Sequence, residues 1–190
     1  MSINLTKGGN VNLTKDAPNP LTTVKVGLGW NVRTTSGSAF DLDGSAFILN
    51  SSGKVNSSDD FIYFNNLRSS NDSIIHSSDN LTGVGDGDDE VITINLTKLS
   101  ADVDKVVIAV NIYDASNRNQ NFGQVSKAYI RIVNADTDEE MARYDLSEDS
   151  STETSMVFGE LYRNDADWKF RAVGQGFQNG LSELTTNFGL

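Results

Sequence analysis

The residues best suited to chemistry in this sequence are the carboxylates of a glycine-rich stretch at residues 79–90, which reads DNLTGVGDGDDE. The stretch contains no lysine or arginine, and like charges packed this closely repel one another unless a cation joins them. Carboxylate oxygens on a chain that can bend are what Ca²⁺ requires. A solvated acidic turn is the alternative interpretation. The candidate ligands by this argument are Asp79, Asp86, Asp88, Asp89 and Glu90.

A second acidic group, Asp41 and Asp43, directly precedes the apolar run at residues 46–49. If a strand begins here, both side chains point to the same side, because residues two apart share a face. We hypothesise that this pair completes the metal site begun by the acidic stretch. The alternative is two exposed acids at the start of a strand.

Other chemistries fit these residues less well. Residues 41–45 match the DxDG[ST] loop of haloacid-dehalogenase-type phosphatases, in which two aspartates act beside Mg²⁺, so a Mg²⁺-dependent phosphotransferase using Asp41 and Asp43 is an alternative function. That loop should follow a buried parallel strand, whereas residues 34–39 are polar. The acidic stretch is not an EF-hand, since Val91 stands where the turn glycine belongs. His76 is expected to be an ordinary surface histidine, and zinc is disfavoured without cysteine or a second histidine.

Composition narrows the range of partners and compartments. The chain has 190 residues, a net charge of −11 and no cysteine. The charge argues against nucleic acid or anionic lipid as a partner, and the lack of cysteine excludes disulfides and thiolate sites. The N-terminus has no apolar signal-peptide core, and no stretch approaches a membrane span. We therefore expect a cytoplasmic protein with one domain over residues 1–190 and no direct membrane insertion.

Hydrophobic patterning predicts an all-β fold. Alternation is clearest at residues 23–30, and residues 105–113 are apolar on both faces, which is typical of a central strand. The long polar segment from residue 67 through the acidic stretch is expected to have little structure, and residues 182–187 to form a short helix. Strands are predicted at residues 2–7 and 11–15 (a hairpin or edge strand), 23–30, 46–49, 61–64, 91–96, 105–113, 129–133, 141–146, 155–163 and 168–173. This pattern favours a β-sandwich of two mainly antiparallel sheets with a few short helices over a parallel α/β sheet.

Several segments together resemble the TerD family of tellurium-resistance and stress-response proteins. They are VGLGW at residues 26–30, DLDGSAF at 41–47, DFIYFNN at 60–66, GVGDGDDE at 83–90, QNFGQV at 120–125, RYDL at 143–146, GELYR at 159–163 and WKFRAVGQG at 168–176. The resemblance spans nearly the whole chain. It departs from the family pattern at Asn31, where the family usually has aspartate, so a metal site using this position should bind more weakly.

The resemblance implies a bacterial, cytoplasmic, non-enzymatic β-sandwich that binds Ca²⁺, with two adjacent ions in acidic loops at one end. The implied metal ligands are Asp41, Asp43, Asp79, Asn80, Asp86, Asp88, Asp89 and Glu90, with Asn65 and Asn66 as further oxygen donors. We hypothesise that Ca²⁺ orders the acidic loops to present a surface to a partner, and other tellurium-resistance proteins are the expected partners. A cyclic-nucleotide-binding module is a further alternative, because a slime-mould cAMP-binding protein is similar to this family.

Overall fold

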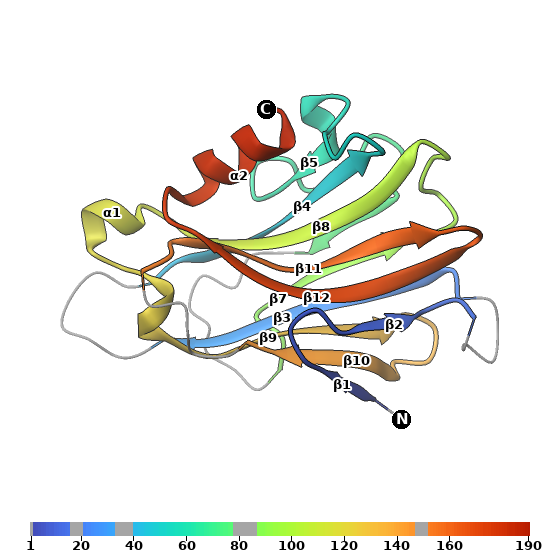
Figure 1. Ribbon diagram of the computed structural model, residues 1–190, viewed down its shortest axis with the longest axis horizontal. Coiled ribbons are helices and arrows are strands. Elements are labelled where there is room, and N and C mark those ends of the chain that lie inside the picture. The colour runs from blue at the N-terminus through green and yellow to red at the C-terminus, as the bar shows by residue number, and fades with distance from the viewer. Residues whose placement is uncertain (1, 16–20, 33–39, 78–86, 147–151) are drawn as a thin grey trace.

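Two six-stranded sheets pack face to face in the computed structural model, which describes residues 2–15, 21–32, 40–77, 87–146 and 152–190 (Figure 1). In order across the sheet, sheet A contains β1 (Ile3–Leu5), β10 (Glu140–Asp145), β9 (Val125–Asn134), β3 (Thr23–Val32), β7 (Glu90–Asn95) and β6 (Ile74–Ser77). Sheet B contains β2 (Asn10–Asn12), β12 (Asp167–Phe177), β11 (Ser155–Asn164), β8 (Val103–Ile112), β4 (Leu42–Asn50) and β5 (Phe61–Ile62). Among these named strands every pairing is antiparallel except that of β1 with β10. The predicted β-sandwich is confirmed.

The main core lies between the sheets and explains the alternating sequence of the strands. In β3 the side chains of Val24, Val26 and Leu28 are fully buried in it, while the residues between them face away. Burial of one face gives the period of two, because successive side chains of a strand point to opposite sides. The predicted strand at residues 23–30 is therefore confirmed.

Sheet B is covered on its outer face as well, by the C-terminal helix α2 (Gly180–Phe188) (Figure 1). Strand β8 places Val106 and Ile108 in the main core and Val107 and Ala109 in a second cluster beneath the helix, where Leu184 is fully buried. Burial on both faces favours apolar residues at successive positions, which is why residues 106–110 of this strand form a continuous apolar run. Both the central strand and the terminal helix were predicted correctly.

Short helical segments complete the described chain: η1 (Ser58–Asp60), α1 (Ala115–Arg118) and η2 (Phe122–Gln124). Among the described residues, no helix has the length and apolar character needed to cross a membrane.

Of the two alternatives predicted for the N-terminal strands, the edge strand is confirmed and the hairpin is wrong. Strand β1 lies at the edge of sheet A beside β10, and β2 lies at the edge of sheet B beside β12. Two three-residue strands cannot bury a face against each other, so each one extends a larger sheet instead. The polar segment after residue 67 also contains β6, in which Ile74 is fully buried against β7.

Candidate metal centre

The predicted ligands divide into three groups in the structure. Asp79, Asn80 and Asp86 lie outside the described residues. Asp88, Asp89 and Glu90 form a continuous segment that leads into β7, and Asp41 and Asp43 lie where β4 begins. The geometry of the last two groups decides which of these carboxylates can face a common ion.

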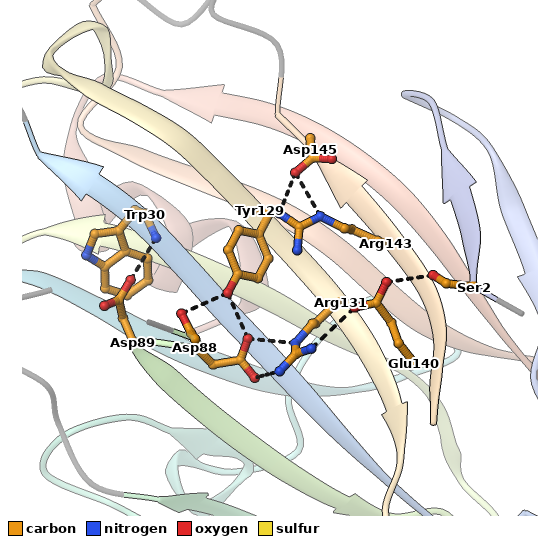
Figure 2. A network of polar contacts seen from close by, with 10 residues as sticks. Ser2, Trp30, Asp88, Asp89, Tyr129, Arg131, Glu140, Arg143 and Asp145 are labelled. Atoms are coloured by element: carbon orange, nitrogen blue, oxygen red, sulfur yellow. Dashed lines mark hydrogen bonds and ion pairs between the residues drawn. The ribbon is translucent and has the colours of Figure 1, made fainter. Parts of the chain in front are cut away.

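Asp88 lies on the outer face of sheet A, engaged by side chains of β9 (Figure 2). Nε and Nη2 of Arg131 donate to its two carboxylate oxygens at 2.7 and 3.0 Å, which is a bidentate ion pair. The Tyr129 hydroxyl lies 3.0 Å from the same carboxylate and 2.9 Å from the carbonyl oxygen of Gly87. A side chain at Gly27 would collide with the Asp88 carboxylate, so glycine is required beneath it. The negative charge of Asp88 is therefore largely neutralised by Arg131.

These contacts also alter the pKa of the neighbouring groups. Burial and the negative charge of Asp88 raise the pKa of the Tyr129 phenol to about 12, so the hydroxyl keeps its proton and donates. The hydrogen bonds to Asp88 raise the pKa of the Arg131 guanidinium above its already high value. Both donors of this contact are thus in their donating forms at every physiological pH.

Asp89 lies beside the end of β3 and is hydrogen-bonded to the backbone of that strand. Its backbone N–H donates to the Leu28 carbonyl at 2.7 Å, and its carboxylate accepts a hydrogen bond from the backbone N–H of Trp30, also at 2.7 Å (Figure 2). Burial raises the pKa of the Asp89 carboxyl, the Trp30 bond partly offsets this, and the charge of Asp88 raises it further. The ionised form of this carboxylate is therefore destabilised, a condition that a nearby cation would relieve.

Glu90 points into the sandwich, opposite to Asp88. Its Oε2 accepts a hydrogen bond of 2.6 Å from the backbone N–H of Gly44 in sheet B, and His76 Nε2 lies 3.3 Å from the same oxygen. His76 Nε2 is also 3.1 Å from the Gly44 carbonyl. The side chains of His76 and Glu90 are only 3% and 1% exposed. The prediction of a surface histidine is wrong, and Glu90 connects the two sheets.

Asp43 faces the outer side of sheet B. Its neighbour Gly44 turns towards Glu90 inside the sandwich, so alternation places Asp43 on the opposite face, where it pairs in register with Asn111. Asp43 is 7% exposed, and the Asp41 carbonyl accepts the N–H of Tyr113 at 2.8 Å. Asn111 and Tyr113 both line a pocket of about 430 Å³. The Asp41–Asp43 pair therefore adjoins an open pocket beside helix α2.

The backbone segments that carry the two halves of the predicted site meet at the Gly44–Glu90 hydrogen bond, since Asp43 and Asp89 are the sequence neighbours of these two residues, but the Asp43 side chain faces the outer side of sheet B. Within the described ranges, however, no three His, Asp or Glu side chains converge as a metal site would require. Three consecutive carboxylates instead take separate directions. All three were predicted to be metal ligands because charge density along a sequence does not show in which direction each side chain points.

Sequence reasoning missed Tyr129 and Arg131, which lie in the predicted strand at residues 129–133 and were given no role in a site. A signal for their role exists in the spacing: Tyr129 and Arg131 are two apart on one face of β9, opposite Gly29 and Gly27 of β3. Two large polar side chains facing two glycines indicate a surface shaped to receive another segment.

Known proteins of one family match this chain over most or all of its length. A family model described as the TerD domain matches residues 1–188. The chain is 56% identical to Tellurium resistance protein TerD of Serratia marcescens, covering 100% of this chain and 98% of that protein. It is 51% identical to General stress protein 16U of Bacillus subtilis (strain 168), over 100% and 98% of the two chains. A crystal structure of a homologue of telluride resistance protein (TerD) from Streptomyces coelicolor A3(2) has the same fold, with a TM-score of 0.71, 23% identity, and coverage of 87% and 95%.

Proposed function

Because the chain belongs to the TerD family of tellurium-resistance and stress-response proteins, we propose that it is a non-enzymatic, cytoplasmic Ca²⁺-binding protein of bacterial stress resistance. Two bound ions would order the acidic loops, and the ordered loops would present a surface to a partner. The observation that carries the proposal is the Gly44–Glu90 hydrogen bond, which brings the segments of the buried carboxylates Asp43 and Asp89 next to each other.

The donor set fits a hard cation. The sequence has no cysteine, and its one histidine is buried between Glu90 and Gly44, so soft or nitrogen-rich coordination has little support. Carboxylate oxygens remain, and Ca²⁺ tolerates irregular coordination by many of them, whereas Mg²⁺ prefers few. The proposed ligands are Asp41, Asp43 and Asp89 of the described chain, with Asp79, Asn80 and Asp86 from outside it.

The proposed partner surface lies beside the Asp41–Asp43 pair. Phe64 and Tyr113 line the pocket there and are 40% and 48% exposed, which is high for aromatic side chains. With a net charge of −11, the protein suits a partner with a basic surface. Another tellurium-resistance protein is the partner that we propose, docking where the bound metal fixes the rim of the pocket.

A Ca²⁺ titration of the thermal unfolding temperature tests the metal proposal. An ion that binds only the folded state stabilises it by about 2.7 kcal/mol at a hundred times its Kd, so the melting temperature should rise with Ca²⁺ and fall again with a chelator. Mg²⁺ at the same concentration is the matched control and should have a smaller effect. If millimolar Ca²⁺ gives no shift, the protein is not a Ca²⁺-binding protein.

The alternative functions receive less support. Asp41 and Asp43 lie at the start of β4, a strand that pairs antiparallel with both of its neighbours, whereas a phosphotransferase loop belongs at the carboxyl end of a parallel strand. A phosphatase assay of the wild type and of Asp41→Asn would revive that function if it detected activity that the variant lacks. A cyclic nucleotide would meet a strongly acidic protein, and calorimetry with cAMP in the presence and absence of Ca²⁺ tests whether metal bridges the phosphate.

A further inference from the structure

We propose that Arg131 and Tyr129 are positioning residues that clamp Asp88 onto sheet A. Asp88 then anchors residues 87–89, here called the acidic segment, instead of binding metal. The clamp itself follows from contacts in the structure. Its consequence for Ca²⁺ affinity rests on the proposed function.

The geometry of Asp88 favours an anchor. Both of its carboxylate oxygens accept hydrogen bonds from the guanidinium fork of Arg131, and the Tyr129 hydroxyl lies 3.0 Å from one of them. The Asp88 side chain is 11% exposed and that of Arg131 31% exposed. A Ca²⁺ ion must approach a ligand oxygen to roughly 2.3–2.6 Å, which here would bring it close to a cation that the same oxygens hold.

The outer face of β3 has no side chains at the two positions beneath Asp88 and Tyr129. The Asp88 carboxylate lies over Gly27, and the Tyr129 ring lies over Gly29, two residues along the same strand. A side chain at either glycine would overlap these groups. The two glycines therefore leave room on the outer face of β3, and the Asp88 carboxylate and the Tyr129 ring fill it.

Further contacts hold the clamping residues in place (Figure 2). Nη1 of Arg131 is 3.3 Å from Glu140, which in turn accepts a hydrogen bond from the Ser2 hydroxyl at 2.6 Å. The Arg143 guanidinium lies 3.8 Å from the centre of the Tyr129 ring and is paired with Asp145. The side chains that grip Asp88 are thus supported from β10 and do not depend on a bound ion.

The clamp fixes three consecutive residues immediately before β7. Tyr129 holds Gly87 through its carbonyl, Arg131 holds Asp88, and Asp89 bonds to the backbone of β3 at Leu28 and Trp30. The Asp89 carboxylate is therefore positioned by contacts within the chain itself. A ligand that is ordered before binding loses less conformational freedom on binding, so the clamp should strengthen metal affinity although Arg131 adds a positive charge.

The sign of the effect of Arg131 variants tests the proposal. If Arg131 acts only by its charge, Arg131→Met should bind Ca²⁺ more tightly and Arg131→Lys should bind like the wild type. The clamp predicts weaker binding in both, by about tenfold in Arg131→Met and less in Arg131→Lys, because lysine keeps the charge but lacks the bidentate fork. Tyr129→Phe, which removes only the hydroxyl and keeps the ring, should also weaken binding.

Asp88→Asn separates an anchor from a ligand. For an anchor, Asp88→Asn and Arg131→Met weaken Ca²⁺ binding alike, and the double variant binds no more weakly than the weaker single variant, since both remove one contact. For a ligand, the two changes act in opposite directions or add, and the proposal is overturned. Arg171→Lys is the matched control, because Arg171 pairs with Glu160 on sheet B and should leave the Ca²⁺ Kd unchanged.

Amide hydrogen exchange in the metal-free protein tests the clamp even if the wild type binds no Ca²⁺, the result that would refute the proposed function. In Arg131→Met the Asp89 and Trp30 amides should exchange about tenfold faster or more, while that of Val26 in the middle of β3 should keep its wild-type rate. Unchanged exchange at Asp89 and Trp30 would overturn the clamp. Acceleration throughout β3 would also overturn it, because it would show that Arg131 supports the sheet and not the segment.

Discussion

The two acidic segments of the chain look alike in sequence and are held differently in the fold. The carboxylates of residues 88–90 contact an arginine fork, a backbone N–H of β3 and a backbone N–H of β4. Asp41 and Asp43 instead stand at the start of β4 beside an open pocket, with Asp43 opposite Asn111. Residues 88–90 therefore connect parts of the fold to one another, whereas Asp41 and Asp43 adjoin a pocket.

This difference shows that a cluster of carboxylates in sequence is not a count of metal ligands. Asp88 and Glu90 are two residues apart, yet one reaches the outer face of sheet A and the other the interior. The reversal arises because Asp88 precedes β7 and folds back over Gly27, while Glu90 is the first residue of the strand. If this difference is correct, substitutions at Glu90 and Gly27 should lower stability, and substitutions at Asp41 and Asp43 should lower Ca²⁺ affinity.

The largest expected effect is on stability, at Glu90. In Glu90→Ala the buried N–H of Gly44 loses its acceptor and a cavity opens between the sheets, so the free energy of unfolding should fall by about 3 kcal/mol. Urea unfolding in the presence of a chelator measures it. Glu90→Gln keeps an acceptor oxygen and should lose less. A loss under about 1 kcal/mol in Glu90→Ala would show that Glu90 does not join the sheets.

The next largest effect is expected at Gly27. A methyl group there would overlap the Asp88 carboxylate, which Arg131 holds in place, so Gly27→Ala should cost about 2 kcal/mol of stability in the metal-free protein. The control is Lys25→Ala on the same face of β3, because Lys25 forms a surface ion pair with Asp138 that contributes little. Equal losses in the two variants would show that the position of Asp88 does not depend on the absence of a side chain at Gly27.

Most of the fold could be predicted from the sequence, because local patterning determined it. The strands of the hairpins β9–β10 and β11–β12 were predicted because each pair consists of two apolar, alternating segments around a short polar turn. The pairings that were missed are distant in sequence: β1 lies beside β10, and β2 beside β12. Strand β6 was missed because its four residues are too few to show a period, and burial of His76 there hides the pattern.

The site was less predictable than the fold because its contacts join residues that are distant in sequence. Arg131 lies 43 residues from Asp88, and nothing in the intervening sequence indicates that they meet. Glu90 contacts Gly44 in the other sheet, 46 residues away. Residue types showed that the chain has many carboxylates, but the direction of each one depends on strand register and on where each strand begins.

A smaller effect, on affinity instead of stability, is expected in the other acidic segment. Asp41→Asn and Asp43→Asn should each weaken Ca²⁺ binding at least tenfold, or about 1.4 kcal/mol, because each removes one charged oxygen ligand. Calorimetric titration measures the affinity. Asp59→Asn, at an exposed position in η1, is the control and should bind as the wild type does. If neither variant weakens binding, the proposed site does not include the start of β4.

The smallest effect concerns Asp167, a carboxylate outside both segments whose electrostatic setting is the reverse of that of Asp89. Hydrogen bonds from the Asn12 and Thr14 side chains lower the pKa of Asp167, whereas burial raises that of Asp89. The bonds that fix β2 to β12 should therefore stabilise the fold above the ordinary aspartate pKa and be lost as the pH falls through the lowered one. An NMR titration of the Asp167 carboxyl should give a midpoint below about 3.9. Asn12→Ala should raise it, because the largest cause of the shift is removed, and an unchanged midpoint would mean that Asn12 does not hold this carboxylate.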